Sequence, residues 1–210
     1  MTSRVYLPLP VRNMDPTTLT TYDNQAAKFA AAQRGKSPEA LQQLIMTYFR
    51  PAGLTADIGC GSGRDTAWLV ANGFPAVGYD ASAGMLAEAR RAFPALTWQQ
   101  AALPDLAEID AGQYQNVLCS AVIMHLPAAS LPLAIANLAR ILAPTGCLLL
   151  TYRASETEDP REPDGRLYTP IVSDHLVGMC RAVGLALQHQ RSSADGGRLG
   201  VVWHVLVAQR

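Results

Sequence analysis

A glycine-rich turn in residues 55–65 constrains the fold of this chain more than any other segment. A short apolar run is followed there by Gly59, Gly61 and Gly63. This pattern predicts the end of a buried strand, a tight turn and the first residues of a helix. Glycines leave no Cβ between the backbone and a ligand, and the helix start directs free N–H groups and the positive end of its dipole to the same point. Asp57 adds a negative charge, so the turn suits a ligand that carries a cation better than a bare phosphate.

A second carboxylate, Asp80, follows the apolar strand predicted at 75–79. Asp80 lies close to the offset at which α/β cofactor folds place an acid that accepts both ribose hydroxyls. Ser82 is a suitable N-cap for the helix that comes next. The dinucleotide fingerprint G-x-G-x-x-G is incomplete, because Arg64 stands where its third glycine would fall. The two segments together predict a cofactor site that differs from the dinucleotide-binding type.

Strand and helix patterns alternate from residue 54 onward, which is typical of a parallel sheet with helices on both faces. Strands are predicted at 54–58, 75–79, 96–100, 115–120 and 146–152, and helices at 63–72, 82–92 and 128–142, with a short or irregular helix at 104–110. Residues 17–33 predict an earlier helical stretch, and Ser37 with Pro38 predicts the start of another helix. Ser173 is expected to cap the last helix and Gly184 to end it. Residues 185–192 and 201–208 predict an antiparallel pair.

Taken in order, these segments resemble the class I S-adenosylmethionine-dependent methyltransferases. The resemblance rests on Asp57-x-Gly59-x-Gly61-x-Gly63, on Gly78-Tyr79-Asp80-Ala81-Ser82 with Met85, and on the runs 114–120, 122–126 and 138–150. It covers about residues 54–153 and continues more loosely to the C-terminus. It implies a Rossmann-like α/β fold with a seven-stranded, mostly parallel sheet in the order 3-2-1-4-5-7-6 and helices on both faces. We expect residues 1–16 to be an extended or disordered lead and 17–210 to be one domain, with an N-terminal helical cap at 17–50 and a loop insertion at 154–170.

The resemblance implies S-adenosyl-L-methionine as the cofactor, S-adenosyl-L-homocysteine as its product, and no metal. It assigns these residues to cofactor binding: Asp57, Gly59, Cys60, Gly61, Gly63, Arg64, Asp80, Ala81, Met85, Ala101, Ala102, Leu103 and Ser120. Asp80 could bind ribose, cap the helix, or do both, and Met85 could be a core residue or edge the pocket. Two positions depart from the family. An acid is frequent at Ala101-Ala102, which leaves Gln100 or a backbone carbonyl for the adenine N–H, and Asp is common at Asn116, where a structural role is expected.

Residues for the methyl acceptor are expected after the fourth and fifth strands and in two lid segments. His125 and Tyr152 are the candidate catalytic residues, and Tyr22, His125, Arg153, Arg166 and Tyr168 are the candidate substrate-binding residues. His125 is either a general base or a pocket-lining histidine. Arg153 either holds an acidic substrate through paired hydrogen bonds or balances local carboxylates. The acids Glu156, Glu158, Asp159, Glu162 and Asp164 are interpreted as a solvated loop that precedes a lid formed by Arg166 and Tyr168.

Charge, hydropathy and cysteine content argue against several other classes of protein. The chain carries 17 Lys and Arg against 17 Asp and Glu with no basic cluster, which argues against a nucleic-acid substrate. No window is long and apolar enough for a membrane span, and the N-terminus lacks the apolar region of a signal peptide. Four widely separated cysteines predict reduced thiols in a cytoplasmic protein, not disulfides or a zinc site. Abundant alanine and arginine suggest a GC-rich bacterial genome.

The sequence therefore predicts an enzyme that methylates a small-molecule oxygen, nitrogen or sulfur nucleophile by in-line displacement, as a monomer or homodimer. Two alternatives stay open. A nicotinamide-dependent oxidoreductase would need a third glycine at position 64 and a base-like Tyr-x-x-x-Lys pair, and neither is present. A non-catalytic module that binds the same cofactor is favoured by the departures at Ala101-Ala102 and Asn116.

Overall fold

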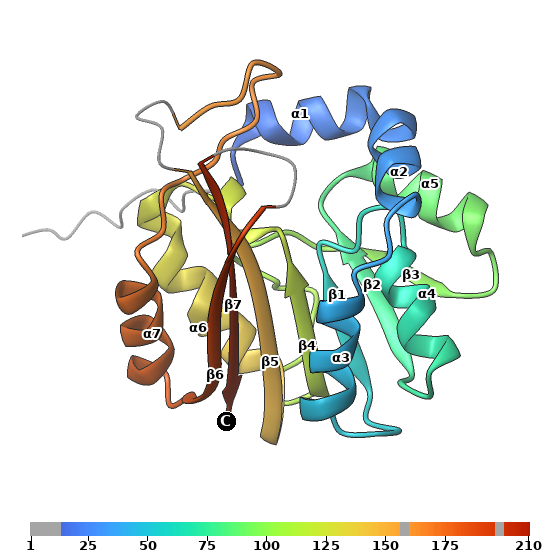
Figure 1. Ribbon diagram of the computed structural model, residues 1–210. Coiled ribbons are helices and arrows are strands. Elements are labelled where there is room, and N and C mark those ends of the chain that lie inside the picture. The colour runs from blue at the N-terminus through green and yellow to red at the C-terminus, as the bar shows by residue number, and fades with distance from the viewer. Residues whose placement is uncertain (1–13, 156–159, 196–199) are drawn as a thin grey trace, which may run out of the picture.

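The computed structural model describes residues 14–155, 160–195 and 200–210, which form a seven-stranded sheet flanked by helices (Figure 1). The strands are β1 (Thr55–Ile58), β2 (Ala76–Asp80), β3 (Thr97–Gln100), β4 (Tyr114–Ser120), β5 (Leu142–Ser155), β6 (Ala186–Ala194) and β7 (Val201–Gln209). Their order is β3-β2-β1-β4-β5-β7-β6, and β7 runs in the direction opposite to the other six strands. The Rossmann-like fold, the strand order and the antiparallel pair predicted from the sequence are confirmed.

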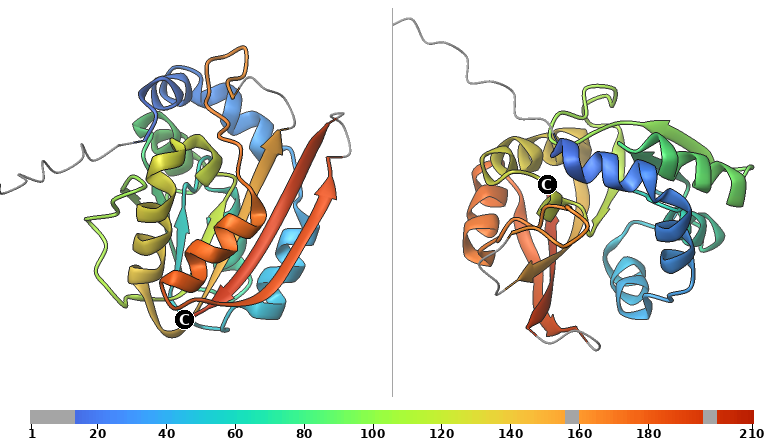
Figure 2. Two further views of the ribbon diagram at one scale, coloured as in Figure 1. Left: turned by 90° about the vertical axis from the view of Figure 1, so that its left-hand side faces the viewer. Right: turned by 90° about the horizontal axis from the view of Figure 1, so that it is seen from above.

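Helices cover both faces of the sheet, as the alternating pattern predicts (Figures 1 and 2). The helices that flank the sheet are α3 (Glu39–Tyr48), α4 (Arg64–Ala71), α5 (Ala83–Ala92), α6 (Leu131–Ile141) and α7 (Ser173–Ala182). Val117 and Cys119 of β4 pack in the core cluster that includes α6 and α7, whereas Leu118 packs in the cluster that includes α3 and α4. Because side chains alternate along a strand, β4 is buried on both faces.

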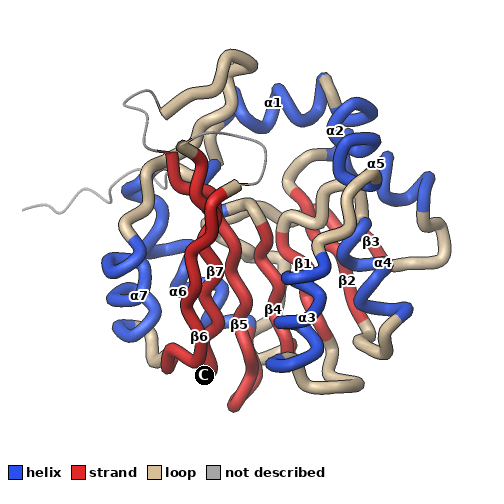
Figure 3. The backbone as a smooth tube through the Cα atoms, viewed as in Figure 1, coloured by secondary structure: helices blue, strands red, loops and turns tan. Residues whose placement is uncertain are grey.

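Two short helices, α1 (Pro16–Asn24) and α2 (Ala26–Arg34), lie across the ends of the parallel strands where β2 and β4 finish (Figures 1 and 3). We call α1 and α2 the cap. The helical stretch predicted at 17–33 is broken at Gln25, whose backbone leaves the helical region at φ −118° and ψ 22°. Asp15 is the N-cap residue of α1, because its carboxylate accepts a 2.9 Å hydrogen bond from the amide of Thr18. Residues 1–13 of the expected lead lie outside the described residues.

The helix predicted at 104–110 is wrong, because this segment consists of turns. Leu106 has a positive φ of 49°, which a right-handed helix does not accommodate. The Arg140 guanidinium donates to the carbonyl oxygens of Leu106 at 2.7 Å and Ile109 at 2.8 Å, so a side chain from α6 satisfies backbone groups of this segment.

Two predicted helix caps are also wrong. Pro38, and not Ser37, is the cap residue of α3, since its carbonyl accepts the first helical hydrogen bond from Gln42. Ser173 is the first residue of α7, and its hydroxyl lies 2.8 Å from the hydroxyl of Tyr152 instead of capping the helix. The expected end of α7 is confirmed, because Gly184 follows it with a φ of +82°.

The described part of the chain contains no helix with the length and apolar character that a bilayer crossing needs. All four cysteines are buried free thiols. Within the same described residues, no group of three or more His, Cys, Asp or Glu side chains is arranged to hold a metal ion. The expected acidic loop is only partly visible in the structure, because Glu156, Glu158 and Asp159 lie outside the described residues.

Candidate active site

The glycine turn after β1 adopts left-handed backbone at all three glycines, with φ of +75° at Gly59, +54° at Gly61 and +78° at Gly63. A Cβ atom at Gly59 would lie 2.2 Å from Val122, and one at Gly63 would lie 2.5 Å from the ring of Trp98. Both glycines are therefore required by packing within the protein. The sequence predicts that all three glycines clear space for a ligand, and the structure differs at Gly59 and Gly63.

Gly61 has a different neighbour. A Cβ atom there would meet the side-chain oxygen of Gln33, the next-to-last residue of α2, at 2.6 Å. That oxygen accepts a 2.9 Å hydrogen bond from the amide of Ser62. Ser62 is fully buried, and its hydroxyl has no hydrogen-bond partner among the described residues. Gly61 is thus covered by a flexible polar side chain of the cap, whereas Gly59 and Gly63 are covered by the apolar side chains of Val122 and Trp98.

Asp80 lies at the end of β2, beside this turn. One oxygen of its carboxylate accepts the amide of Gly61 at 2.8 Å, and the other accepts the amide of Ser82 at 2.9 Å. Burial raises the pKa of Asp80, and these N–H donors oppose that rise. Each carboxylate oxygen retains a further lone pair for a ligand hydroxyl. The carboxylate is therefore held in a fixed orientation next to Gly61.

Asp57 is almost fully buried and accepts a 2.6 Å hydrogen bond from the hydroxyl of Thr66. Burial, followed by the nearby charge of Asp65, raises the pKa of Asp57 to about 7. The fixed negative charge expected at this position is thus only partly present at neutral pH. Asp57 holds the start of α4 against β1 through Thr66.

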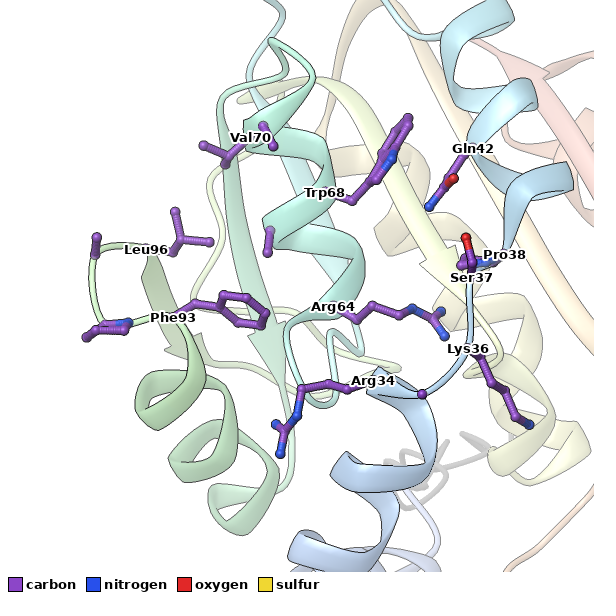
Figure 4. Close-up of a pocket in the computed structure, with 15 residues that line it drawn as sticks. Arg34, Lys36, Ser37, Pro38, Gln42, Arg64, Trp68, Val70, Phe93 and Leu96 are labelled. Carbon is purple, nitrogen blue, oxygen red and sulfur yellow. The ribbon is translucent and has the colours of Figure 1, made fainter.

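Arg64 points away from the turn toward the cap and α4. Its guanidinium pairs with Asp65 through two 2.8 Å hydrogen bonds and donates to the backbone oxygen of Gln33 at 3.1 Å. Arg64 lines an open groove of about 810 Å³ beside α4, together with Trp68 and Phe93 (Figure 4). This groove contains none of the other predicted cofactor residues.

Some of the remaining predicted cofactor residues are packed in the core, and the others lie at the carboxyl ends of the strands. Cys60 packs in an apolar cluster, Met85 packs against the cap helices, and Leu103 is buried in the main core. The hydroxyl of Ser120 lies 2.9 Å from that of Thr151. Ala81, Ala101 and Ala102 follow β2 and β3 at the same edge of the sheet as Asp80, and Ala101 donates its amide to the carbonyl of Asp80 at 3.2 Å.

The five predicted substrate-binding residues lie together although they come from distant parts of the chain. We call them the acceptor cluster: Tyr22, His125, Arg153, Arg166 and Tyr168. The rings of His125 and Tyr168 have centroids 4.7 Å apart, and those of Tyr22 and His125 are 5.5 Å apart. The guanidinium of Arg153 lies 4.4 Å from the ring centroid of Tyr168, and that of Arg166 lies 5.5 Å from it.

Hydrogen bonds in the acceptor cluster fix the tautomer of His125. Its Nδ1 lies 2.7 Å from the carbonyl oxygen of Leu167. A carbonyl only accepts, so Nδ1 carries the proton and Nε2 is left as an acceptor. Nε2 lies 3.1 Å from the hydroxyl of Tyr22, which therefore donates to it. Arg166 in turn donates to the Tyr22 oxygen at 3.2 Å.

Burial keeps both members of the Tyr22–His125 pair neutral. It lowers the pKa of His125 to about 4 and raises the pKa of Tyr22 to about 12. The guanidinium groups of Arg166 and Arg153 lower the pKa of His125 further. Protonating His125 would place an imidazolium beside two other cations, so the environment opposes its action as a general base.

Tyr152, the second candidate catalytic residue, is not brought into the acceptor cluster. Its ring stacks on His204 at a centroid distance of 4.9 Å, and its hydroxyl lies 2.8 Å from Ser173. Asn116 has the structural role that was expected. Its side-chain oxygen accepts the amide of Arg50 at 2.8 Å, and its amide nitrogen donates to the carbonyl oxygens of Arg50 and Gly53.

The cap supplies contacts that sequence reasoning missed. Asp23 accepts the hydroxyl of Ser82 at 2.6 Å and the amide of Gly84 at 3.0 Å, which ties α1 to the start of α5. Gln33 reaches the glycine turn as described above, and Phe29 packs 4.7 Å from the guanidinium of Arg166. None of these residues belongs to a local motif, so the sequence offered no signal for them.

The chain is similar in part of its sequence and in its fold to known methyltransferases. A family model described as a methyltransferase domain matches residues 56–146. A trans-aconitate 2-methyltransferase of Methylobacterium nodulans is 38% identical over 124 residues, which are 56% of this chain and 43% of that protein. One of Azoarcus is 36% identical over 132 residues, which are 61% of this chain and 49% of that protein. The matched region thus spans about half the length of these curated relatives.

Solved structures of similar fold cover nearly the whole chain. The 1,6-didemethyltoxoflavin-N1-methyltransferase of Burkholderia thailandensis, solved with 1,6-didemethyltoxoflavin and S-adenosylhomocysteine bound, is 19% identical with a TM-score of 0.71. The alignment covers 98% of this chain and 93% of that one. A putative methyltransferase solved with the Haloferax volcanii Trm112 activator is 18% identical with a TM-score of 0.75, over 92% of this chain and 98% of that one.

Proposed function

We propose that the chain is a class I S-adenosylmethionine-dependent methyltransferase and that it transfers the methyl group of S-adenosyl-L-methionine to a small-molecule acid. The observation that carries the cofactor assignment is the carboxylate of Asp80, which the amides of Gly61 and Ser82 hold at the end of β2. This is the position at which open α/β sheets bind their ligands.

The residues present fit this cofactor. Asp80 would accept the two ribose hydroxyls, and the backbone at Gly61 and Ser62 would receive the amino-acid part once Gln33 moves aside. The hydroxyl of Ser62, which has no hydrogen-bond partner among the described residues, offers a further polar contact. Met85, which is buried against the cap, would border the adenosine. The cofactor supplies a methyl group already activated on a sulfonium, so the protein's task is to bind, align and exclude water.

Alignment is the contribution that this architecture favours. The cap and the acceptor cluster lie at the carboxyl ends of the parallel strands, and positioning two reactants contributes roughly 7–11 kcal/mol toward lowering a barrier. Neutral His125 accepts the proton of the Tyr22 hydroxyl through Nε2, which fixes the orientation of the Tyr22 side chain. Removal of a proton by His125 is opposed by the two guanidinium groups beside it.

An acceptor that arrives as an anion needs no base, and this supports the acid class. The two curated relatives are named for methylation of trans-aconitate, a carboxylic acid. An acceptor carboxylate oxygen would form the new bond to carbon while the bond from carbon to sulfur breaks, with the electron pair remaining on sulfur. The negative charge of the acceptor and the positive charge of the sulfonium cancel, and no proton moves.

The proposal extends to the setting of the reaction. The formal net charge of zero favours a small molecule over a nucleic acid as the acceptor. The four buried free thiols suit the reducing conditions of the cytoplasm. We propose action there as a monomer or a homodimer.

Calorimetric titration with S-adenosylhomocysteine tests the cofactor assignment. Wild type should bind it, Asp80→Asn should bind it at least about tenfold more weakly through loss of a charge-assisted hydrogen bond, and the exposed-site control Asp105→Asn should match wild type. Equal affinity of Asp80→Asn and wild type would refute the role of Asp80. Tighter binding of NAD than of S-adenosylhomocysteine would support the oxidoreductase alternative.

Turnover of labelled S-adenosylmethionine against a panel of carboxylic acids tests the reaction. Methyl ester formation is the expected result. Binding of the cofactor without transfer to any acid or to neutral hydroxyl, amine and thiol compounds would favour the non-catalytic module.

A further inference from the structure

Arg153 is a buried cation with an unused donor. It extends from β5 into the acceptor cluster and is only 8% exposed. Its Nη1 pairs with a carboxylate oxygen of Glu162 at 2.5 Å, whereas its Nε–H has no hydrogen-bond partner among the described residues. A guanidinium normally receives a carboxylate through two parallel hydrogen bonds. The position of Glu162 therefore uses only part of what Arg153 offers, and a buried unmet donor is unfavourable.

Glu162 comes from the segment 160–170, which closes over the acceptor cluster beside the cap. Leu167 donates its amide to the hydroxyl of Thr18 at 2.8 Å, and Arg161 pairs with Asp15 at 2.8 Å, so the segment is fastened to α1 at two points. The side chain of Glu162 is 30% exposed, whereas that of Arg153 is 9% exposed. The carboxylate can thus leave toward solvent while the guanidinium remains.

The need to neutralise the buried Arg153 guanidinium determines which chemical groups can replace Glu162. The Arg153–Glu162 pair is neutral as a whole, so exchange of one carboxylate for another leaves the buried charge unchanged. A neutral ligand in the same place would leave the guanidinium uncompensated, which costs several kcal/mol. The site therefore discriminates in favour of a second carboxylate.

The carboxylate held by Arg153 is distinct from the one that receives the methyl group. Tyr22 packs with Met85, which lies on the side of the proposed cofactor site, whereas the ring of Tyr168 contacts both Arg153 and His125. Paired hydrogen bonds also withdraw electron density from a carboxylate, which makes it a poor nucleophile. The reacting oxygen belongs near Tyr22, and a second acid group of the same molecule belongs on Arg153.

We propose that Arg153 binds a non-reacting carboxylate of the acceptor and that Glu162 occupies this position as an internal substitute until the acceptor displaces it. The acceptor is then at least a dicarboxylate. This inference rests on the proposed function for the identity of the site, and it adds the subsite and the exchange.

Direct binding separates this proposal from the proposed reaction, because it does not require turnover. Trans-aconitate, succinate and butyrate are titrated into the protein saturated with S-adenosylhomocysteine, as tri-, di- and monocarboxylate probes. Trans-aconitate and succinate should each bind at least about tenfold more tightly than butyrate, as expected for one added charge-assisted contact. Equal affinities for the three acids would overturn the proposal.

Variants test the exchange. Glu162→Gln should bind succinate several-fold more tightly than wild type, because the competing carboxylate is gone, whereas a purely structural ion pair predicts unchanged or weaker binding. Arg153→Gln should weaken succinate binding at least about tenfold, and Arg153→Lys, which keeps the charge without the planar fork, should fall between.

All three variants should bind S-adenosylhomocysteine within about threefold of wild type, as should the exposed control Glu39→Gln. Tighter succinate binding by Glu162→Gln together with intact cofactor binding supports the proposal. Weaker succinate binding by Glu162→Gln, or unchanged binding by Arg153→Gln, overturns it. Absence of methyl transfer in the presence of this binding pattern would refute the proposed reaction and leave the carboxylate subsite standing.

Discussion

Alanine substitutions at Gly61 and Gly63 should separate cofactor binding from fold stability, although the two glycines lie two residues apart in one turn. Both have left-handed backbone, so a Cβ atom costs about 1–2 kcal/mol at either position. The neighbours differ. The new Cβ would lie 2.5 Å from the Trp98 ring at Gly63 and 2.6 Å from the Gln33 side-chain oxygen at Gly61.

The ability of each neighbour to move sets the magnitude. Trp98 is 8% exposed, and its indole N–H donates to the carbonyl of Phe93 at 3.1 Å, so the ring cannot withdraw freely. Overpacking of this kind costs about 1–3 kcal/mol, which brings Gly63→Ala to about 2–5 kcal/mol in total. Gln33 is the end of a flexible side chain, and Gly61→Ala should cost only about 1–2 kcal/mol.

Thermal unfolding and titration with S-adenosylhomocysteine measure the two effects on the same samples. At roughly 2–4 °C per kcal/mol for a domain of this size, the melting temperature should fall by about 4–20 °C in Gly63→Ala and by about 2–8 °C in Gly61→Ala. Cofactor affinity should fall at least about tenfold in Gly61→Ala and much less in folded Gly63→Ala. Equal destabilisation, or full affinity in Gly61→Ala, would refute the assignment of one glycine to the ligand and the other to the core.

Two further predictions concern buried polar residues. Asn116→Asp should lower the free energy of unfolding by about 2–3 kcal/mol in chemical denaturation, because a carboxylate cannot donate to the carbonyl oxygens of Arg50 and Gly53; an unchanged stability would contradict this structural role. Asp57 has a native pKa of about 7 against an ordinary value near 4, so the native state binds the extra proton between these values and stability of the cofactor-free protein should fall as pH rises from about 4 to 7. Asp57→Asn should flatten that profile, and a wild-type stability that rises over this range would contradict the burial argument.

Much of the fold was predictable because its signals are local. The apolar runs and the glycine turn identified the five parallel strands, and the family resemblance supplied their order. The local structure that was predicted wrongly depends on contacts with residues far away in the chain. The turns at 104–110 are held by Arg140 of α6, and Ser173 is drawn into a hydrogen bond with Tyr152 on β5.

In the acceptor cluster, too, some residues were predictable from local signals and others depend on distant contacts. His125 and Arg153 were expected there because the ends of parallel strands share one edge of the sheet. Tyr152 and Arg153 are adjacent in β5, and adjacent strand residues point to opposite faces. Only one of the two side chains can therefore point toward the acceptor cluster. The sequence did not say which of the two it is. The partner of Arg153 was not predictable, since Glu162 was one of several acids in its loop.

The cap contacts both halves of the proposed site, so it is the element through which cofactor binding can influence acceptor binding. Asp23 and Gln33 of the cap bind backbone groups of the cofactor elements, while Tyr22 binds His125 on the acceptor side. Each of these contacts ends in a flexible polar side chain, so a ligand can replace it one hydrogen bond for another at little net cost. A cofactor that displaces Gln33 would remove one contact of α2, and α2 adjoins α1 at Gln25. An acceptor that enters at Arg153, as proposed, would meet a segment held next to α1 by Arg161 and Thr18, so we expect the cap to affect the binding of both ligands.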